Sequence, residues 1–143
     1  MSPDDLSAVH RSWSTLRLRR DPLLAALTRR FEEAPISSLA ADVRAAWLLD
    51  AVEELVGLLS APSCLAERAR RLGETWPDPL IAPSFAIEGR AWMGAACESL
   101  PTWSERTEVA WRQAWLLLSE VLAAESLSPF ADAPQRRHSA DQP

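Results

Sequence analysis

Six segments of the chain place apolar residues at steps of three and four positions, the spacing of one helix face. Prolines fall at or near the ends of several segments, as at Pro22, Pro35, Pro62 and Pro101. No segment alternates apolar and polar residues over the length of a strand, and only four of the 143 residues are glycine. The pattern predicts an all-α fold. The expected helices span, in order, residues 3–16, 22–34, 42–59, 65–72, 84–99 and 104–125.

The length fits one domain that buries its own core. We expect this domain over residues 1–130, followed by a flexible polar tail over residues 131–143, which is poor in apolar side chains. Ser2 and Pro3 are typical of a helix start, with Ser2 accepting from the first free amides.

Charge and hydropathy exclude several classes of partner. Fifteen basic against twenty acidic residues give a net charge of -5, a field that repels phosphate, so we expect no nucleic-acid partner. No apolar run is long enough to cross a bilayer, and the first residues lack the pattern of a signal peptide. We therefore expect a cytoplasmic protein with no membrane partner.

No set of residues has the spacing of a catalytic or metal site. Cys64 and Cys97 are far apart and form no CxxC pair, so we expect buried free thiols and no bound metal. No serine has an adjacent base, and no glycine-rich phosphate loop is present. The sequence predicts a protein that is not an enzyme.

Seven tryptophans are the most unusual feature of the composition. Those at helical spacing are typical either of core residues or of anchors between copies of the chain. The core is the favoured interpretation. The candidate interface residues are Trp103, Trp111 and Trp115.

Four stretches follow one another with a characteristic spacing: Leu6–Trp13, Arg29–Pro35, Arg71–Gly73 and Trp103–Trp115. Together they resemble the bacterial single-domain globins, over residues 4 to about 125. The resemblance implies a globin-like orthogonal bundle of six to eight helices. It also implies a haem held between the long middle helix and the helix that follows Gly73, with a histidine as iron ligand.

The chain departs from the globin pattern at the haem site. In the family the ligating histidine stands three residues after the Leu-Gly pair, where this chain has Trp76, whose indole nitrogen has no lone pair to give to iron. The tyrosine that often faces bound gas corresponds to Leu27, and the distal glutamine or histidine corresponds to Arg44. The stretch at residues 36–41, where a haem-packing phenylalanine is expected, is short.

These departures predict a haem-free fold in which side chains fill the vestigial pocket, because a large void is costly at native packing density. We expect no cofactor, and a regulatory or signalling role through a protein partner or self-association. The residues expected at the pocket are Trp76, Arg44, Leu27, Trp47, Leu48, Phe85 and Trp92.

Two alternatives remain open. The first is a haem b protein that binds oxygen or another diatomic gas through an unconventional ligand among His10, Met93 and Cys97. The second is a binder of another apolar or anionic small molecule in the vestigial pocket, with Arg44 at its mouth, or of a bilin joined to Cys64 or Cys97. Arg44 as an ordinary solvated helix residue is the simpler interpretation.

Overall fold

Six α-helices and one 3-10 turn make up the described part of the chain, which contains no strand. We describe a computed structural model over residues 1–33, 39–77 and 85–141, with side chains through residue 124. The predicted all-α fold class is confirmed. The elements are α1 (Pro3–Leu16), η1 (Arg17–Arg19), α2 (Arg20–Glu33), α3 (Ala41–Leu58), α4 (Pro62–Glu74), α5 (Ala86–Ser99) and α6 (Glu105–Asp141).

Helix α1 begins as the sequence predicts. The Ser2 hydroxyl accepts from the Asp5 amide at 3.0 Å, and the Asp5 carboxylate accepts from the Ser2 amide at 3.1 Å. This reciprocal pair is a capping box, and Pro3 occupies the first turn. The chain passes through η1 directly into α2, so Pro22 lies in the first turn of α2, where its missing N–H costs no hydrogen bond.

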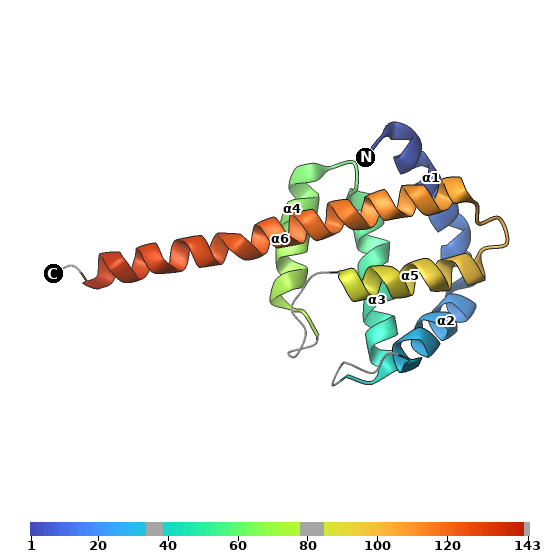
Figure 1. Cartoon of the computed structure of the whole chain (residues 1–143), viewed down its shortest axis with the longest axis horizontal. Helices are drawn as coiled ribbons and strands as arrows, with labels where there is room; N and C mark the ends of the chain where they lie inside the picture. Colours follow the sequence, from blue (N-terminus) through green and yellow to red (C-terminus); the bar gives the residue numbers. More distant parts are fainter. Residues whose placement is uncertain (34–38, 78–84, 142–143) are drawn as a thin grey trace.

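The helices pack in two crossing sets around one core (Figure 1). In this view α5 and α6 run across α3 and α4. Helix α1 packs against α6, α2 packs against both α3 and α5, and α4 packs against α6. The first and last helices are therefore neighbours, and α2 links α3 to α5.

Three tryptophans from three helices meet in the core, and we call them the indole cluster. The Trp92 ring lies 5.8 Å from the ring of Trp13 and 5.2 Å from the ring of Trp111, measured between centroids. Trp111 Nε1 donates to the buried Ser12 hydroxyl at 2.8 Å, and that hydroxyl donates to the Ala8 carbonyl at 2.8 Å. The cluster joins α1, α5 and α6, and the prediction that these tryptophans are core residues is confirmed.

Ion pairs at the surface join α1 to α6 and α2 to α5. Arg106 of α6 donates to the Asp5 carboxylate of α1 at 2.6 Å, and this hydrogen bond is the largest cause that holds the pKa of Asp5 below its ordinary value of 3.8. Glu98 of α5 accepts from Arg29 and Arg30 of α2. The Arg29 hydrogen bond is the largest cause that lowers the pKa of Glu98.

Some boundaries and exposures differ from the sequence-based predictions. Helix α4 continues one residue past Gly73, to Glu74. The prediction of buried thiols is wrong, because Cys64 and Cys97 lie on exposed positions of α4 and α5.

Other predictions fall partly or wholly outside the described residues. Half of the short stretch at residues 36–41 lies in residues 36–38, outside the described part of the chain. Helix α6 continues to Asp141, past its predicted end at residue 125 and into the predicted tail, and the flexibility of residues 131–143 stays a prediction. Over the part of the chain that is described, no helix combines the length and apolar character needed to cross a bilayer.

Candidate functional site

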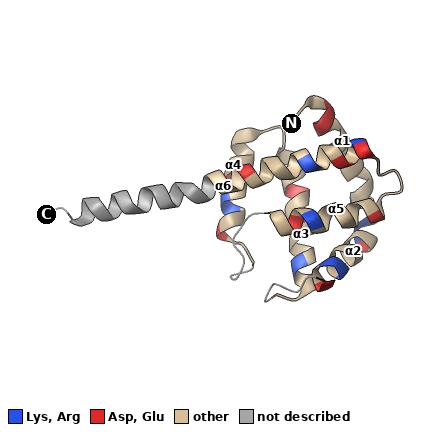
Figure 2. Cartoon of the chain, in the orientation of Figure 1, with Lys and Arg blue, Asp and Glu red and all other residues tan. Residues whose placement is uncertain are grey.

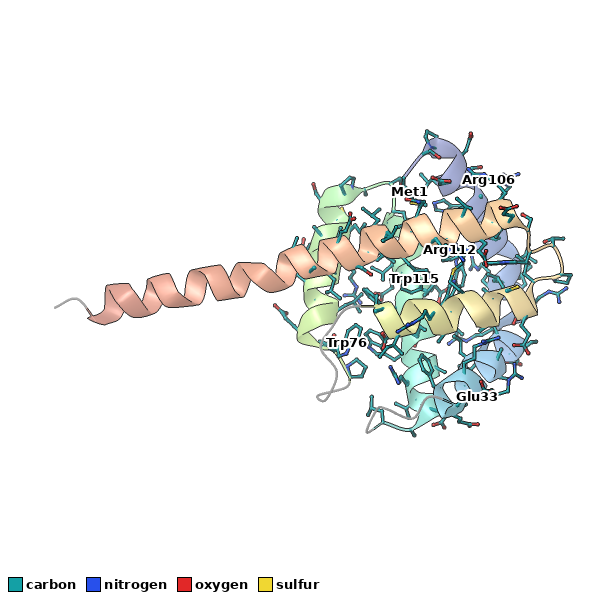
Figure 3. All side chains as sticks on the ribbon, viewed as in Figure 1. Met1, Glu33, Trp76, Arg106, Arg112 and Trp115 are labelled. Atoms are coloured by element: carbon teal, nitrogen blue, oxygen red, sulfur yellow. The ribbon has the colours of Figure 1, made fainter. Side chains whose placement is uncertain are left out.

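Four aromatic rings form a continuous row from α3 to α6, and we call them the aromatic row. The Trp76 ring stands edge-on to Trp47 at 5.0 Å and to Phe85 at 5.5 Å between centroids. Phe85 in turn lies 5.5 Å from Trp115 of α6. Figure 3 shows Trp76 beyond the end of α4, near the start of α5. The edge-to-face geometry is the one that the ring quadrupoles favour.

Phe85 lies between Trp76 and Trp115 in the aromatic row. It is 1% exposed and directly precedes α5, in the left-handed region at φ 58° and ψ 5°. A phenylalanine in that region costs about 1–3 kcal/mol. The ring contacts on both of its sides offset this cost, so the row fixes how the chain enters α5.

A buried ion pair lies between α3 and α5. Arg44 Nη2 donates to Glu88 Oε1 at 3.0 Å, and the two side chains are only 3% and 4% exposed. The guanidinium of Arg44 also stacks over the Phe31 ring of α2, 4.4 Å from its centroid. Arg44 is therefore not a solvated helix residue, and its carboxylate partner belongs to the chain itself.

The structure divides the predicted pocket residues among four places. Trp47, Trp76 and Phe85 meet in the aromatic row. Arg44 lies in the ion pair with Glu88. Leu27 and Leu48 are fully buried core residues of α2 and α3. Trp92 was expected beside Trp76 but packs in the indole cluster with Trp13 and Trp111, because it lies about two helical turns further along α5 than Phe85.

Glu88 was not among the residues predicted from the sequence. Its position carries the signal that could have revealed it, since Phe85, just before α5, is followed at steps of three and four by Glu88 and Trp92. Arg44 and Leu48 share a face of α3 in the same way. When an acidic and a basic residue fall on the buried faces of two helices, they are expected to form an ion pair with each other. A buried charge without a partner would destabilise the fold strongly.

The side chains around Trp76 do not fit a haem. Trp76 Nε1 is buried without a hydrogen-bond partner among the described residues, and it carries a hydrogen where an iron ligand needs a free lone pair. The rings of Trp47 and Phe85 occupy the space on two sides of it. The Arg44 guanidinium, at the position that corresponds to the distal residue, is already held by Glu88.

Other potential iron ligands lie elsewhere. Met93 borders a groove between α5 and α6, Cys97 is exposed on α5, and His10 is on α1. Within residues 1–33, 39–77 and the described side chains from 85 on, no three His, Cys, Asp or Glu side chains are grouped to hold a metal ion.

The three tryptophans proposed as interface anchors differ in exposure. Trp111 is 1% exposed in the indole cluster, and Trp115 is 6% exposed in the aromatic row. Trp103, in the connection from α5 to α6, is the one of the three that is only partly buried.

Comparisons with known proteins identify no relative. No protein-family model matches the chain, and neither the curated proteins nor the solved structures gave a match.

Proposed function

We propose that this chain is a haem-free, globin-like helical module that acts in the cytoplasm through protein contacts, in regulation or signalling, rather than by catalysis. The observation that carries the proposal is the aromatic row. Trp76 stands where the globin resemblance implies an iron ligand, and its ring packs against Trp47 and Phe85. The chain thus fills with its own side chains the space that a cofactor would need.

The Arg44–Glu88 pair supports the same proposal. A small acidic ligand in the vestigial pocket would need the Arg44 guanidinium, and Glu88 already neutralises it at 3.0 Å. The all-α fold of the described residues is compatible with the resemblance.

The haem-free part of the proposal is tested by titrating the purified protein with haemin. We expect a weak, non-saturating visible spectrum like that of free haemin, in the oxidised, reduced and carbon monoxide states. A sharp stoichiometric band with a six-coordinate reduced carbon monoxide complex would establish the alternative, a haem protein with an unconventional ligand.

The contact part of the proposal is tested by cross-linking the intact protein in cells and identifying what is joined to it. We propose Trp103 as a contact residue, because its side chain is only partly buried against the core. One recurrent partner, or a second copy of the chain, is expected, and Trp103→Ala should weaken that contact. Leu18→Ala is the control, since Leu18 is 84% exposed on η1. Cross-links spread over abundant proteins alone would contradict the proposal.

A further inference from the structure

A groove with a volume of about 490 Å³ lies between α5 and α6, and Phe85 is the one lining residue that it shares with the set expected at the vestigial pocket. Phe85, Gly89 and Trp115 are its most buried residues, with Met93 and Leu116 beside them. Figure 3 places Trp115 and Arg112 on the part of α6 that runs alongside α5. The volume is in the range of small-molecule sites in proteins.

The depth of the groove depends on Gly89. A Cβ at this position would lie 3.3 Å from Cδ2 and 3.4 Å from Cγ of Trp115. Because glycine has no Cβ, the Trp115 ring can lie flat against the backbone of α5. The ring then forms an apolar floor between the two helices.

Two arginines border this floor, one from each helix. Arg90 of α5 is exposed and has no ion pair with any residue whose side chain is described. Among the described side chains, Arg112 of α6 pairs only with Glu108, at the long distance of 3.5 Å, and its side chain is 66% exposed. Figure 2 shows basic positions on both helices. The groove is therefore locally cationic in a chain of net charge -5.

We propose that the α5–α6 groove binds a free amphipathic carboxylate, such as a medium-chain fatty acid. Its hydrocarbon chain lies on Phe85, Trp115 and Leu116, and its carboxylate pairs with Arg90 and Arg112. Burial of apolar surface supplies most of the affinity, and the two guanidiniums select an anionic head group. Glu108 competes with the ligand for Arg112.

A second copy of the chain fits this surface less well. A twofold dimer would place two hollows face to face, and it would bring the arginines of one copy towards those of the other. A monomeric ligand with an apolar chain and one negative charge matches both the shape and the charge of the groove.

The test is calorimetric titration of the full chain with decanoate, and with decyltrimethylammonium as the cationic counterpart. We expect saturable binding of decanoate and none of the cation. Arg90→Gln and Arg112→Gln should each weaken decanoate binding about fivefold, as for an exposed charge pair. Glu108→Gln should strengthen it, because the competing carboxylate is gone.

Matched control variants distinguish the effect of the groove residues on binding from the effect of the net charge of the protein. Arg19→Gln makes the same charge change on η1 and should leave the affinity unchanged. Leu116→Asp should weaken binding at least about tenfold, because it removes apolar surface and adds a like charge. Leu116 is 54% exposed, so the substitution leaves the core intact, and Leu18→Asp at an 84% exposed position is its control.

Several outcomes would overturn the proposal. One is equal binding of the two head groups, and another is equal loss in Arg19→Gln and Arg90→Gln. A third is binding to anionic vesicles without binding to decanoate. The last is a concentration-dependent dimer in sedimentation that Leu116→Asp dissociates while decanoate has no effect. None of these depends on whether haemin binds, so this test is independent of the proposed function.

Discussion

Arg44 of α3 and Glu88 of α5 form an ion pair at 3.0 Å with both side chains almost completely buried. One carboxylate oxygen, Glu88 Oε2, has no hydrogen-bond partner among the described residues. A buried pair of this kind is costly to break and inexpensive to replace by apolar residues. We therefore expect it to specify how α3 and α5 pack against each other more than to stabilise the fold.

Breaking this pair from one side should be strongly destabilising. We expect Glu88→Met and Arg44→Met each to lower the free energy of unfolding by about 3–5 kcal/mol. The double variant Arg44→Met with Glu88→Met should recover most of the loss. Urea unfolding of the four proteins measures the coupling.

The control for this cycle is the exposed pair of Arg20 and Asp50, at 3.0 Å. Asp50→Asn should change the free energy of unfolding by less than about 1 kcal/mol. Additive losses in the double variant of Arg44 and Glu88 would contradict the account of the buried pair.

Removing the Trp76 ring should show how much the aromatic row contributes to the free energy of unfolding. We expect Trp76→Ala to cost about 2 kcal/mol in unfolding free energy, less than a fully buried tryptophan, because Trp76 is partly exposed. Trp76→Phe keeps a ring against Trp47 and Phe85 and should cost less than about 1 kcal/mol. Equal stability of the wild type and Trp76→Ala would show that the ring is not packed there.

Ser12 and Ser14 provide a matched pair of substitutions on α1. Each hydroxyl donates to a carbonyl four residues earlier, but only Ser12 also accepts from Trp111 Nε1. Ser12→Ala leaves that buried indole N–H unpaired, so we expect a loss of about 1–3 kcal/mol. Ser14→Ala at the exposed position should be close to neutral. Thermal unfolding of the two variants distinguishes them, and similar losses would contradict the role of Ser12.

Acid should weaken the contact between α1 and α6. The pKa of Asp5 is held below its ordinary value of 3.8, chiefly by the hydrogen bond from Arg106. A lowered pKa stabilises the fold above the ordinary value, and this stabilisation is lost as the pH falls through the folded-state pKa. We therefore expect Asp5→Asn to be less stable than the wild type at neutral pH, with the difference shrinking below pH 3.8.

Unfolding midpoints measured between neutral pH and strong acid test this prediction. Glu53→Gln is the control, because Glu53 is exposed on α3 and has no ion pair with the described side chains. A constant difference between Asp5→Asn and the wild type at every pH would contradict the assignment to Asp5.

Several features of the site followed from the sequence only in part. Apolar spacing predicted that Trp13, Trp92 and Trp111 are core residues, but not that Trp92 joins the other two rather than Trp76. The thiols of Cys64 and Cys97 were expected inside and lie outside. A residue type has an average tendency to be buried, but whether a particular cysteine is buried depends on the helix face that it occupies.

The sequence by itself determined the all-α fold class, the order of the helices and the cap at Ser2, because these depend on periodicity and on contacts between near neighbours in the chain. Only the tertiary structure decided that Arg44 meets Glu88, that Trp76 meets Trp47, and that a groove opens beside Gly89. A helical repeat shows which residues face inward. It leaves open the rotation and crossing of the helices, and those set which inward-facing residues touch.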